Sequence, residues 1–218
     1  MKMSIVIKVR TYIDRYRVVS LCNLMTHFYY ISKNNLISIT RLLYKQKHIG
    51  YSVPEKKNPN SVLYFSKHFN PNYSTTIFDN DALAITKCIT ALDSFRNKYK
   101  EDYKIVYEEL AFYPTVIKFG AEPRGGGDLR NIQLVYLPYS DESELAKYMG
   151  GLFDEKYEKK YNVIKYIVVE SKGMLRGKFP QQISDYISNT KGFVICSHDN
   201  LSAEFYSPEE LGVITTNE

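Results

Sequence analysis

The sequence predicts a mixed α/β (α+β) protein, in which a small basic helical part precedes a larger part built on a mixed sheet flanked by helices. Three observations favour this fold class. Apolar residues recur at helical spacing in the first part, short apolar runs rich in β-branched residues recur in the second, and the net charge differs sharply between them. A chain of 218 residues can form one large domain or two small ones. We expect two, residues 1–72 and residues 73–218.

The charge is divided unevenly along the chain. Residues 1–72 contain 12 Lys and Arg against 2 Asp and Glu, a net charge of +10. Residues 73–218 contain 17 against 22, a net charge of −5, and the two values sum to the +5 of the whole chain. A small basic part joined to a larger acidic part is typical of a nucleic-acid-binding module attached to a separate catalytic body.

The basic part contains two helical patterns and a hairpin pattern. Apolar residues between positions 18 and 29 recur at i, i+3, i+4 and i+7, which predicts a helix starting near Arg15, while residues 5–12 fit a short strand or the start of a helix. Ser32 is expected to cap a second helix that ends near Gly50. Apolar residues at 51–53 and 62–65, on either side of a turn-rich segment, predict a hairpin.

Helices followed by a hairpin resemble a winged helix-turn-helix domain. The resemblance implies that one helix enters the major groove of DNA and that basic residues of the wing contact phosphate groups. The candidate nucleic-acid contacts are the basic residues at the end of the second helix and in the hairpin, namely Arg41, Lys45, Lys47, Lys56 and Lys57.

The larger part alternates between helical and strand patterns after an expected linker at 69–72. The acidic residues Asp79 and Asp81 are expected to cap a long helix that runs to Tyr99 and resumes as far as Leu110, ending before Pro114. Apolar runs then predict strands at 115–119, 132–136, 167–169 and 193–196, and residues 203–206 form the last recognisable element. Helices are expected at 181–188 and in an insertion at 141–161.

Charged residues lie at the ends of these strands. Gly125-Gly126-Gly127-Asp128 precedes the strand at 132–136, and the strand at 167–169 runs into Glu170-Ser171-Lys172. Because side chains alternate along a strand, Glu170 and Lys172 are expected on one face. Glu108 and Glu109 belong to the predicted helix upstream. An acidic helix, an Asp opening a strand and a Glu-x-Lys ending the next strand, in this order, resemble the PD-(D/E)xK nuclease superfamily over roughly residues 100–206.

The resemblance implies a restriction-endonuclease-like fold and a metal-dependent DNA endonuclease. Mg²⁺, replaceable by Mn²⁺, would be bound by Asp128, Glu170 and the carbonyl oxygen of Ser171. Lys172 would orient the attacking water, and Glu108 or Glu109 would serve the same site. The other implied site residues are the phosphate contacts Arg124 and Arg130 and the accessory glutamines Gln181 and Gln182.

The sequence departs from the family pattern at two points. Pro123 lies five residues before Asp128 and not directly before it, and 41 residues separate Asp128 from Glu170. If Asp128 is not the ligand, Asp141 or Asp154 would take its place. Helical periodicity does not choose between Glu108 and Glu109.

Three hypotheses about function follow. The first is an endonuclease of a plasmid, phage or other mobile element, acting in replication, conjugation or defence, for which a homodimer would be the simplest way to cut both strands. The second is a non-catalytic DNA-binding protein, a replication initiator or transcription regulator, on a nuclease-like scaffold. The third is an interaction protein with no nucleic-acid role. Steep loss of DNA affinity with salt separates the first two from the third.

Composition limits the other classes of protein. The three cysteines, Cys22, Cys88 and Cys196, are odd in number and widely spaced, which favours a reducing, cytoplasmic setting. No apolar run approaches the ~20 residues of a membrane span. There is neither a Walker A sequence nor a dinucleotide-binding fingerprint, so no nucleotide cofactor is expected.

Overall fold

The structure is a computed structural model of the whole chain. It describes residues 4–53, 62–67, 75–111, 116–136, 163–170, 190–196 and 201–211, with the backbone alone for 75–81. Several predicted features lie outside the described residues: the linker at 69–72, the insertion at 141–161, the helix at 181–188, and the candidate site residues Lys56, Lys57, Ser171, Lys172, Gln181 and Gln182.

The N-terminal elements form three helices against a small sheet. In chain order they are α1 (Ile5–Tyr16), β1 (Val18–Ser20), α2 (Leu21–His27), α3 (Lys33–Lys45), β2 (Ile49–Ser52) and β3 (Leu63–Ser66). The sheet has the order β1-β3-β2, with both pairs antiparallel. The predicted hairpin is therefore confirmed as β2 and β3, and the N-terminal segment is helical.

Local hydrogen bonds decide where these helices begin. The Ser32 side chain accepts a hydrogen bond from the Asn35 N–H and caps α3, as predicted. Ser20 caps α2, because its hydroxyl accepts from the Asn23 N–H and the Asn23 side chain accepts from the Ser20 N–H, both at 3.0 Å. The single helix predicted from Arg15 to residue 29 is wrong, since α1 ends at Tyr16 and β1 intervenes.

Gly50 has a different role from the predicted helix cap. It lies in β2, opposite Phe65 of β3. A Cβ atom on Gly50 would stand only 2.0 Å from the Phe65 ring. Glycine leaves room there for the aromatic side chain, which crosses directly over its backbone.

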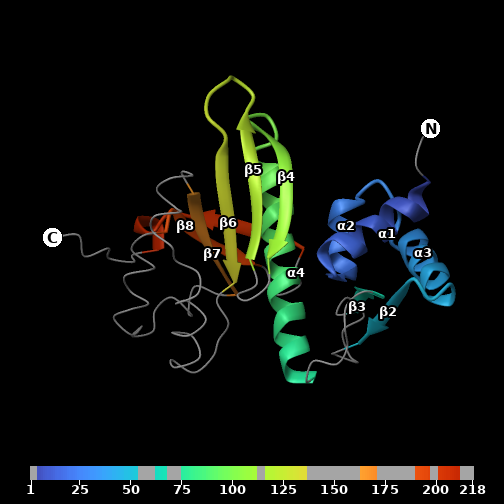
Figure 1. Cartoon of the computed structure of the whole chain (residues 1–218). Helices are drawn as coiled ribbons and strands as arrows, with labels where there is room; N and C mark the ends of the chain where they lie inside the picture. The colour runs from blue at the N-terminus through green and yellow to red at the C-terminus, as the bar shows by residue number, and fades with distance from the viewer. Residues whose placement is uncertain are drawn as a thin grey trace.

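The larger part consists of one long helix packed on a six-stranded sheet (Figure 1). Its elements are α4 (Thr75–Lys98), β4 (Tyr103–Ala111), β5 (Val116–Pro123), β6 (Arg130–Tyr136), β7 (Val163–Val169), β8 (Gly192–Cys196), β9 (Ala203–Tyr206) and the short 3-10 helix η2 (Glu209–Leu211). The strands are in chain order across the sheet. β6, β7 and β8 are parallel, and the other neighbouring pairs are antiparallel. The expected mixed sheet is confirmed.

The predicted extension of the long helix to Leu110 is wrong. α4 begins at Thr75, so Asp79 and Asp81 lie inside it and do not cap it, and it ends at Lys98. Residues 103–111 form β4, with a bulge between Ile105 and Tyr107. The bulge shifts the alternation, so the strand mimics the i, i+3, i+4 spacing of a helix. Glu108 and Glu109 are therefore strand residues.

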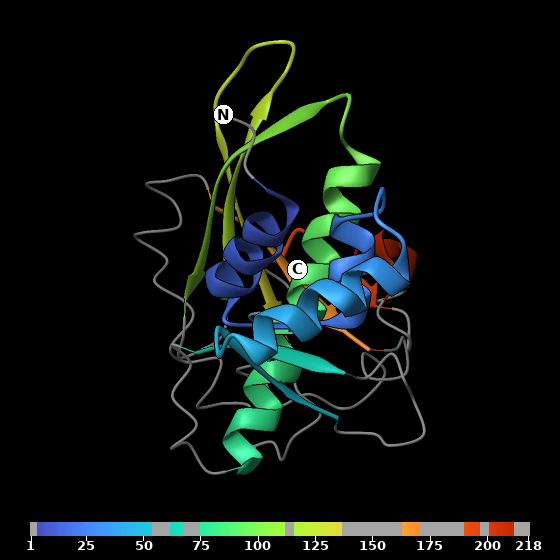
Figure 2. The same ribbon diagram turned by 90° about the vertical axis from the view of Figure 1, so that its right-hand side faces the viewer.

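The hydrophobic core runs without a break through both parts of the chain. Ile13 and Tyr16 of α1, Leu92 of α4 and Phe119 of β5 all belong to one buried cluster. A buried amide fixes the contact, because Asn23 of α2 donates to the Thr86 carbonyl oxygen at 3.2 Å and to Thr90 Oγ1 at 3.0 Å. Figure 2 shows the N-terminal helices in front of α4 and β4, and of these helices α2 packs on α4 while α1 reaches β4 through the hydrogen bond from Tyr16 to Glu108. Among the described residues, no helix combines the length and apolar character needed to cross a membrane.

Candidate functional site

The two central carboxylates of the predicted metal site lie at opposite ends of the sheet. Asp128 is exposed in the turn between β5 and β6, and Glu170 is exposed directly after β7. β6 and β7 are parallel, with Asn131 opposite Val163. Asp128 precedes that pair by three residues and Glu170 follows it by seven, so at about 3.3 Å per residue they stand roughly 33 Å apart along the strands.

This geometry does not fit the predicted magnesium centre. Mg²⁺ is held by oxygen atoms about 2.1 Å from the ion, so one ion cannot join carboxylates at the two ends of a strand. Within the part of the chain that the structure describes, no three His, Cys, Asp or Glu side chains gather closely enough to hold a metal ion. The prediction that Asp128 and Glu170 bind one ion was wrong. Asp128 precedes β6 and Glu170 follows β7, so the two residues could meet only if the strands were antiparallel, and β6 and β7 are parallel.

The three glycines before Asp128 serve the turn. Gly126 has φ +85° and Gly127 has φ +125°, values that favour glycine. The Gly126 N–H donates to the Pro123 carbonyl oxygen at 3.2 Å. These residues reverse the chain from β5 into β6.

Glu170 is linked to the neighbouring strand. The Tyr136 hydroxyl, at the end of β6, donates a hydrogen bond of 2.9 Å to Glu170 Oε1. Burial, followed by the charge of Glu170, raises the pKa of Tyr136, so this hydroxyl keeps its proton and acts as a donor. The contact places Glu170 at the edge where the parallel strands end.

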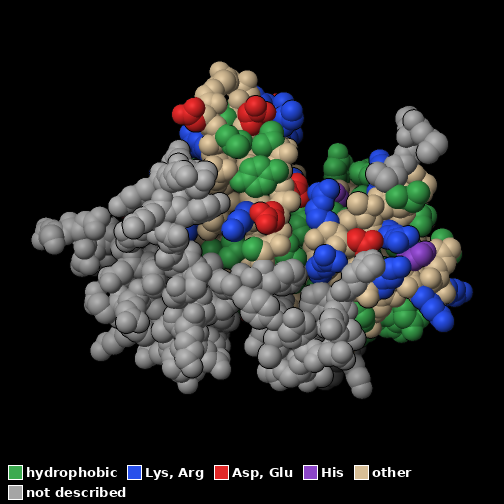
Figure 3. Space-filling view, in the orientation of Figure 1, with side chains coloured by type: hydrophobic (Ala, Val, Ile, Leu, Met, Phe, Trp, Pro, Cys, Tyr) green, Lys and Arg blue, Asp and Glu red, His purple; other side chains and the backbone are tan. Residues whose placement is uncertain are grey.

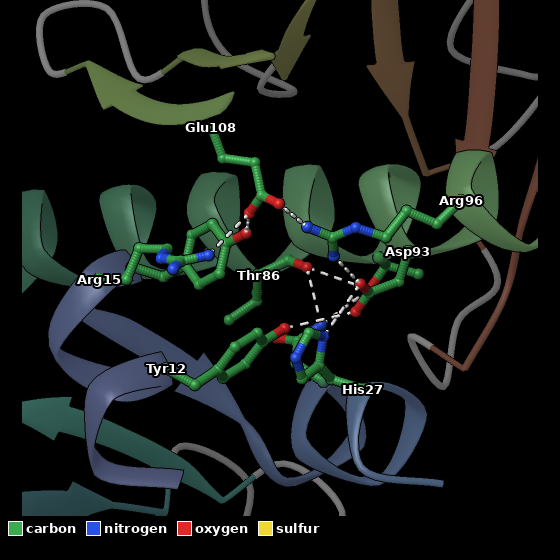
Figure 4. Close-up of polar contacts among 10 residues, drawn as sticks. Tyr12, Arg15, His27, Thr86, Asp93, Arg96 and Glu108 are labelled. Carbon is green, nitrogen blue, oxygen red and sulfur yellow. Dashed lines mark hydrogen bonds and ion pairs between the residues drawn. The ribbon is translucent and has the colours of Figure 1, made fainter. Parts of the chain in front are cut away.

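Glu108 belongs to a polar cluster between α1, α4 and β4 (Figure 4). Its carboxylate accepts hydrogen bonds from Arg96 on α4 and from Tyr16 on α1, and it pairs with Arg15 at 3.3 Å. Burial opposes ionisation, but Arg96 and the Tyr16 hydroxyl outweigh it, and the pKa of Glu108 is lowered. Both carboxylate oxygen atoms already accept hydrogen bonds from these side chains. Glu108 therefore joins α1, α4 and β4, which differs from the catalytic role predicted for it.

The same cluster continues through Asp93. Arg96 Nη1 donates to Asp93 Oδ1 at 2.5 Å, the Tyr12 hydroxyl donates to Oδ2 at 3.3 Å, and His27 Nδ1 lies 3.5 Å from Oδ1. The rings of Tyr12 and His27 stack with centroids 4.1 Å apart. Tyr12, Arg15, Tyr16, His27, Asp93, Arg96 and Glu108 form what we call the interface cluster. No local pattern in the sequence indicates this cluster, because its hydrogen bonds join residues up to 93 positions apart.

Glu109 lies on the opposite face of β4 from Glu108, away from α4. It faces Lys118 of β5, which faces Gln133 of β6, which faces Lys165 of β7, so four polar residues cross the sheet in one row. Glu109 is exposed, whereas Gln133 and Lys165 are buried. Burial lowers the pKa of Lys165 to about 8. Figure 3 looks onto this face, where an acidic and a basic side chain lie side by side over the strands.

The exposed surface of α3 carries a polar stripe. Leu36, Thr40 and Leu43 are buried. At 100° per residue, the opposite side of the helix consists of four exposed residues, Asn34, Ser38, Arg41 and Lys45. This side faces solvent, and Figure 3 shows several Lys and Arg side chains on the surface of the N-terminal helices.

The predicted basic contacts near α3 are exposed. Arg41, Lys45 and Lys47 take part in no ion pair with the described residues. Next to them, the exposed rings of Tyr44 on α3 and Tyr51 on β2 pack edge to face, with their centroids 5.0 Å apart. The helix and the adjoining hairpin strand therefore form one surface of cations and aromatic rings.

Arg124 and Arg130 lie at the two ends of the turn between β5 and β6. Arg124 donates from its backbone N–H to the Asp102 carbonyl oxygen and from Nε to the Lys100 carbonyl oxygen, both at 2.9 Å. The Arg130 guanidinium lies over the Tyr103 ring, 5.1 Å from its centroid. Both arginines are thus placed beside the end of α4 and the start of β4.

Comparisons of the chain with protein-family models, with curated proteins and with solved structures found no match.

Proposed function

We propose that the protein binds duplex DNA through α3 and the β2–β3 hairpin. The observation that carries the proposal is the stripe of Asn34, Ser38, Arg41 and Lys45 directly opposite the buried side of α3. The order of three helices with a hairpin after the third supports the winged helix-turn-helix resemblance.

The residue types of the stripe suit the major groove. An α-helix fits this groove, where Arg can bind guanine through two hydrogen bonds and Asn can bind adenine in the same way. Lys45 and Lys47, at the end of α3, suit phosphate contacts, which supply most of the affinity and make it depend on salt. The net charge of +10 over residues 1–72 supplies long-range attraction for the DNA backbone.

Fluorescence anisotropy with a labelled duplex tests this proposal. The wild type should bind, and its affinity should fall steeply as salt is raised. Arg41→Ala and Lys45→Ala should each weaken binding by about tenfold, whereas Lys191→Ala, an exposed lysine beside β8, should bind as the wild type does. Equal binding by all four proteins would refute a role for α3.

Metal-dependent DNA hydrolysis is a second candidate, favoured by the position of Glu170. β6, β7 and β8 are parallel and end at one edge, and ligands of open sheets commonly bind outside the carboxyl ends of parallel strands. Asp141, the alternative partner in the sequence, follows Tyr136 at the end of β6 by five residues.

A cleavage assay separates this arrangement from the one first predicted. Labelled plasmid would be incubated with Mg²⁺, Mn²⁺ or EDTA and with Glu170→Gln, Asp141→Asn or Asp128→Asn protein. Loss of metal-dependent cleavage in the first two variants but not in Asp128→Asn would support a site at the carboxyl edge. Binding without cleavage in any metal would leave DNA binding as the function.

A further inference from the structure

A cavity of about 220 Å³ lies between the end of α4, the start of β4 and the turn after β5. Phe95 of α4, Tyr99 and Lys100 in the turn that follows it, Tyr103 of β4 and Arg124 are among the residues that line it. Of the described residues around the cavity, four are cationic and none is acidic. A concave surface with this composition attracts anions.

Two of the four cations can serve a ligand. Arg96 already binds Asp93 and Glu108, and Lys104 lies opposite Glu122 in the β4–β5 register. This leaves Lys100 and Arg124.

Arg124 is held in place before any ligand arrives. Its backbone N–H and its Nε bind the carbonyl oxygens of Asp102 and Lys100, so the rest of the guanidinium is oriented by the turn. Lys100 pairs only loosely with Glu101, at 3.9 Å with both side chains well exposed, and such pairs contribute little. An oriented guanidinium beside an ammonium group is a suitable arrangement for a phosphate group.

Aromatic rings form the other part of the wall. The Tyr99 and Tyr103 rings stand 6.3 Å apart at 81°, and the Phe95 ring lies 4.7 Å from that of Tyr99. Rings next to cations are the combination that proteins use for nucleotides, because bases stack on rings while cations bind the phosphate.

The size of the cavity limits the ligand. A volume of about 220 Å³ equals that of roughly seven water molecules at about 30 Å³ each, and it is smaller than the ~300 Å³ at which pockets for drug-sized ligands begin. It suits one phosphate group with one adjoining ring and is too small to enclose a dinucleotide. We propose that this cavity binds a single nucleotide through its phosphate group and base, either free or at the 5′ end of a nucleic-acid strand.

Isothermal titration calorimetry with the full chain tests the proposal. The probes are a nucleoside 5′-monophosphate, the matching nucleoside, and a short single-stranded oligonucleotide with or without a 5′ phosphate. The monophosphate should bind, the nucleoside should bind at least tenfold more weakly, and affinity should fall with salt. Arg124→Gln and Lys100→Gln should each weaken binding about tenfold, whereas Lys8→Gln, an exposed lysine on α1, should not change it.

The two sources of the nucleotide are distinguished by the oligonucleotide. Tighter binding of the 5′-phosphorylated strand than of the monophosphate would assign the cavity to a strand end, and the reverse order would assign it to a free nucleotide. Because Arg124 also binds backbone carbonyls, Arg124→Lys is included to preserve its charge, and circular dichroism checks folding.

Two results would overturn the proposal: no binding of any probe at millimolar concentration, or unchanged binding by the folded Arg124→Gln, Lys100→Gln double variant. The outcome is independent of DNA binding by α3. The Arg41→Ala, Lys45→Ala double variant should lose affinity for duplex DNA yet bind the monophosphate as the wild type does.

Discussion

Two groups of cationic side chains in this protein differ in what surrounds them. On α3, Arg41 and Lys45 face solvent, and no carboxylate among the described residues pairs with them. In the interface cluster, Arg96 lies between Asp93 and Glu108. A cation beside carboxylates stabilises the contact between elements, whereas an exposed cation without a partner is available for phosphate. The comparison shows that the position of the acidic residues decides what each basic residue does.

The largest expected effect tests the interface cluster. Glu108→Gln removes the charge that Arg96 and Arg15 face, so the largely buried Arg96 loses one of its two carboxylate partners and keeps only Asp93. We expect the free energy of unfolding to fall by about 2–3 kcal/mol, measured by urea denaturation. Glu109→Gln, the next residue on the same strand, is the matched control, and because its side chain is exposed it should change stability by less than about 0.5 kcal/mol. Equal effects would show that the cluster does not join the two parts.

The pH dependence of the same variant sharpens this test. The pKa of Glu108 is lowered in the folded protein, so the contribution of its carboxylate is fully present above the ordinary glutamic acid value of 4.5 and is lost as the pH falls through the folded value. The stability difference between wild type and Glu108→Gln should therefore shrink below about pH 4.5. A difference that stays constant down to pH 2.5 would contradict the ion-pair explanation.

The next effect concerns DNA affinity. Arg41→Ala should weaken duplex binding by about 1–3 kcal/mol and reduce its sequence preference if Arg41 reads a base edge. Arg15→Ala removes another exposed arginine, one that is already paired with Glu108, and it should change DNA affinity much less. Competition binding against duplexes of varied sequence measures both effects. A larger loss for Arg15→Ala would move the DNA surface from α3 to α1.

The smallest expected effect concerns the cap of α3. Ser32→Ala removes the side-chain acceptor for the Asn35 N–H and should cost about 1 kcal/mol of unfolding free energy. DNA affinity should fall by less than in Arg41→Ala, because the helix remains packed through Leu36 and Leu43. Thermal unfolding together with the anisotropy assay measures both quantities, and a loss of binding without a loss of stability would give Ser32 a direct contact with DNA.

Much of the fold could be predicted from local sequence. The Ser32 cap, the hairpin and four of the strand runs in the larger part follow from side-chain alternation and capping, which act over a few residues. β4 could not be predicted, because its bulge gives Tyr103, Val106, Tyr107 and Leu110 the spacing of a helix. Whether a short apolar segment without a clear period forms a helix or a strand is decided by the sheet that it joins.

The candidate sites were less predictable than the fold. Arg41 and Lys45 could be singled out because exposure follows from their position relative to the apolar stripe of one helix. Asp128 and Glu170 were paired wrongly, since nothing near either residue shows that β6 and β7 run parallel. Neither the interface cluster nor the cavity at Arg124 could be predicted, because each is assembled from separate elements.

By itself, the sequence determined the mixed fold class, the basic character of residues 1–72 and the buried and exposed sides of α3. These properties depend on composition and on periodicities of a few residues. Only the tertiary structure decided that Glu108 binds arginines on two helices, that Glu109 faces the other side of the sheet, and that Asp128 and Glu170 lie at opposite ends. The physical reason is that strand direction, register and helix packing depend on burying one common core, and no short segment carries that information.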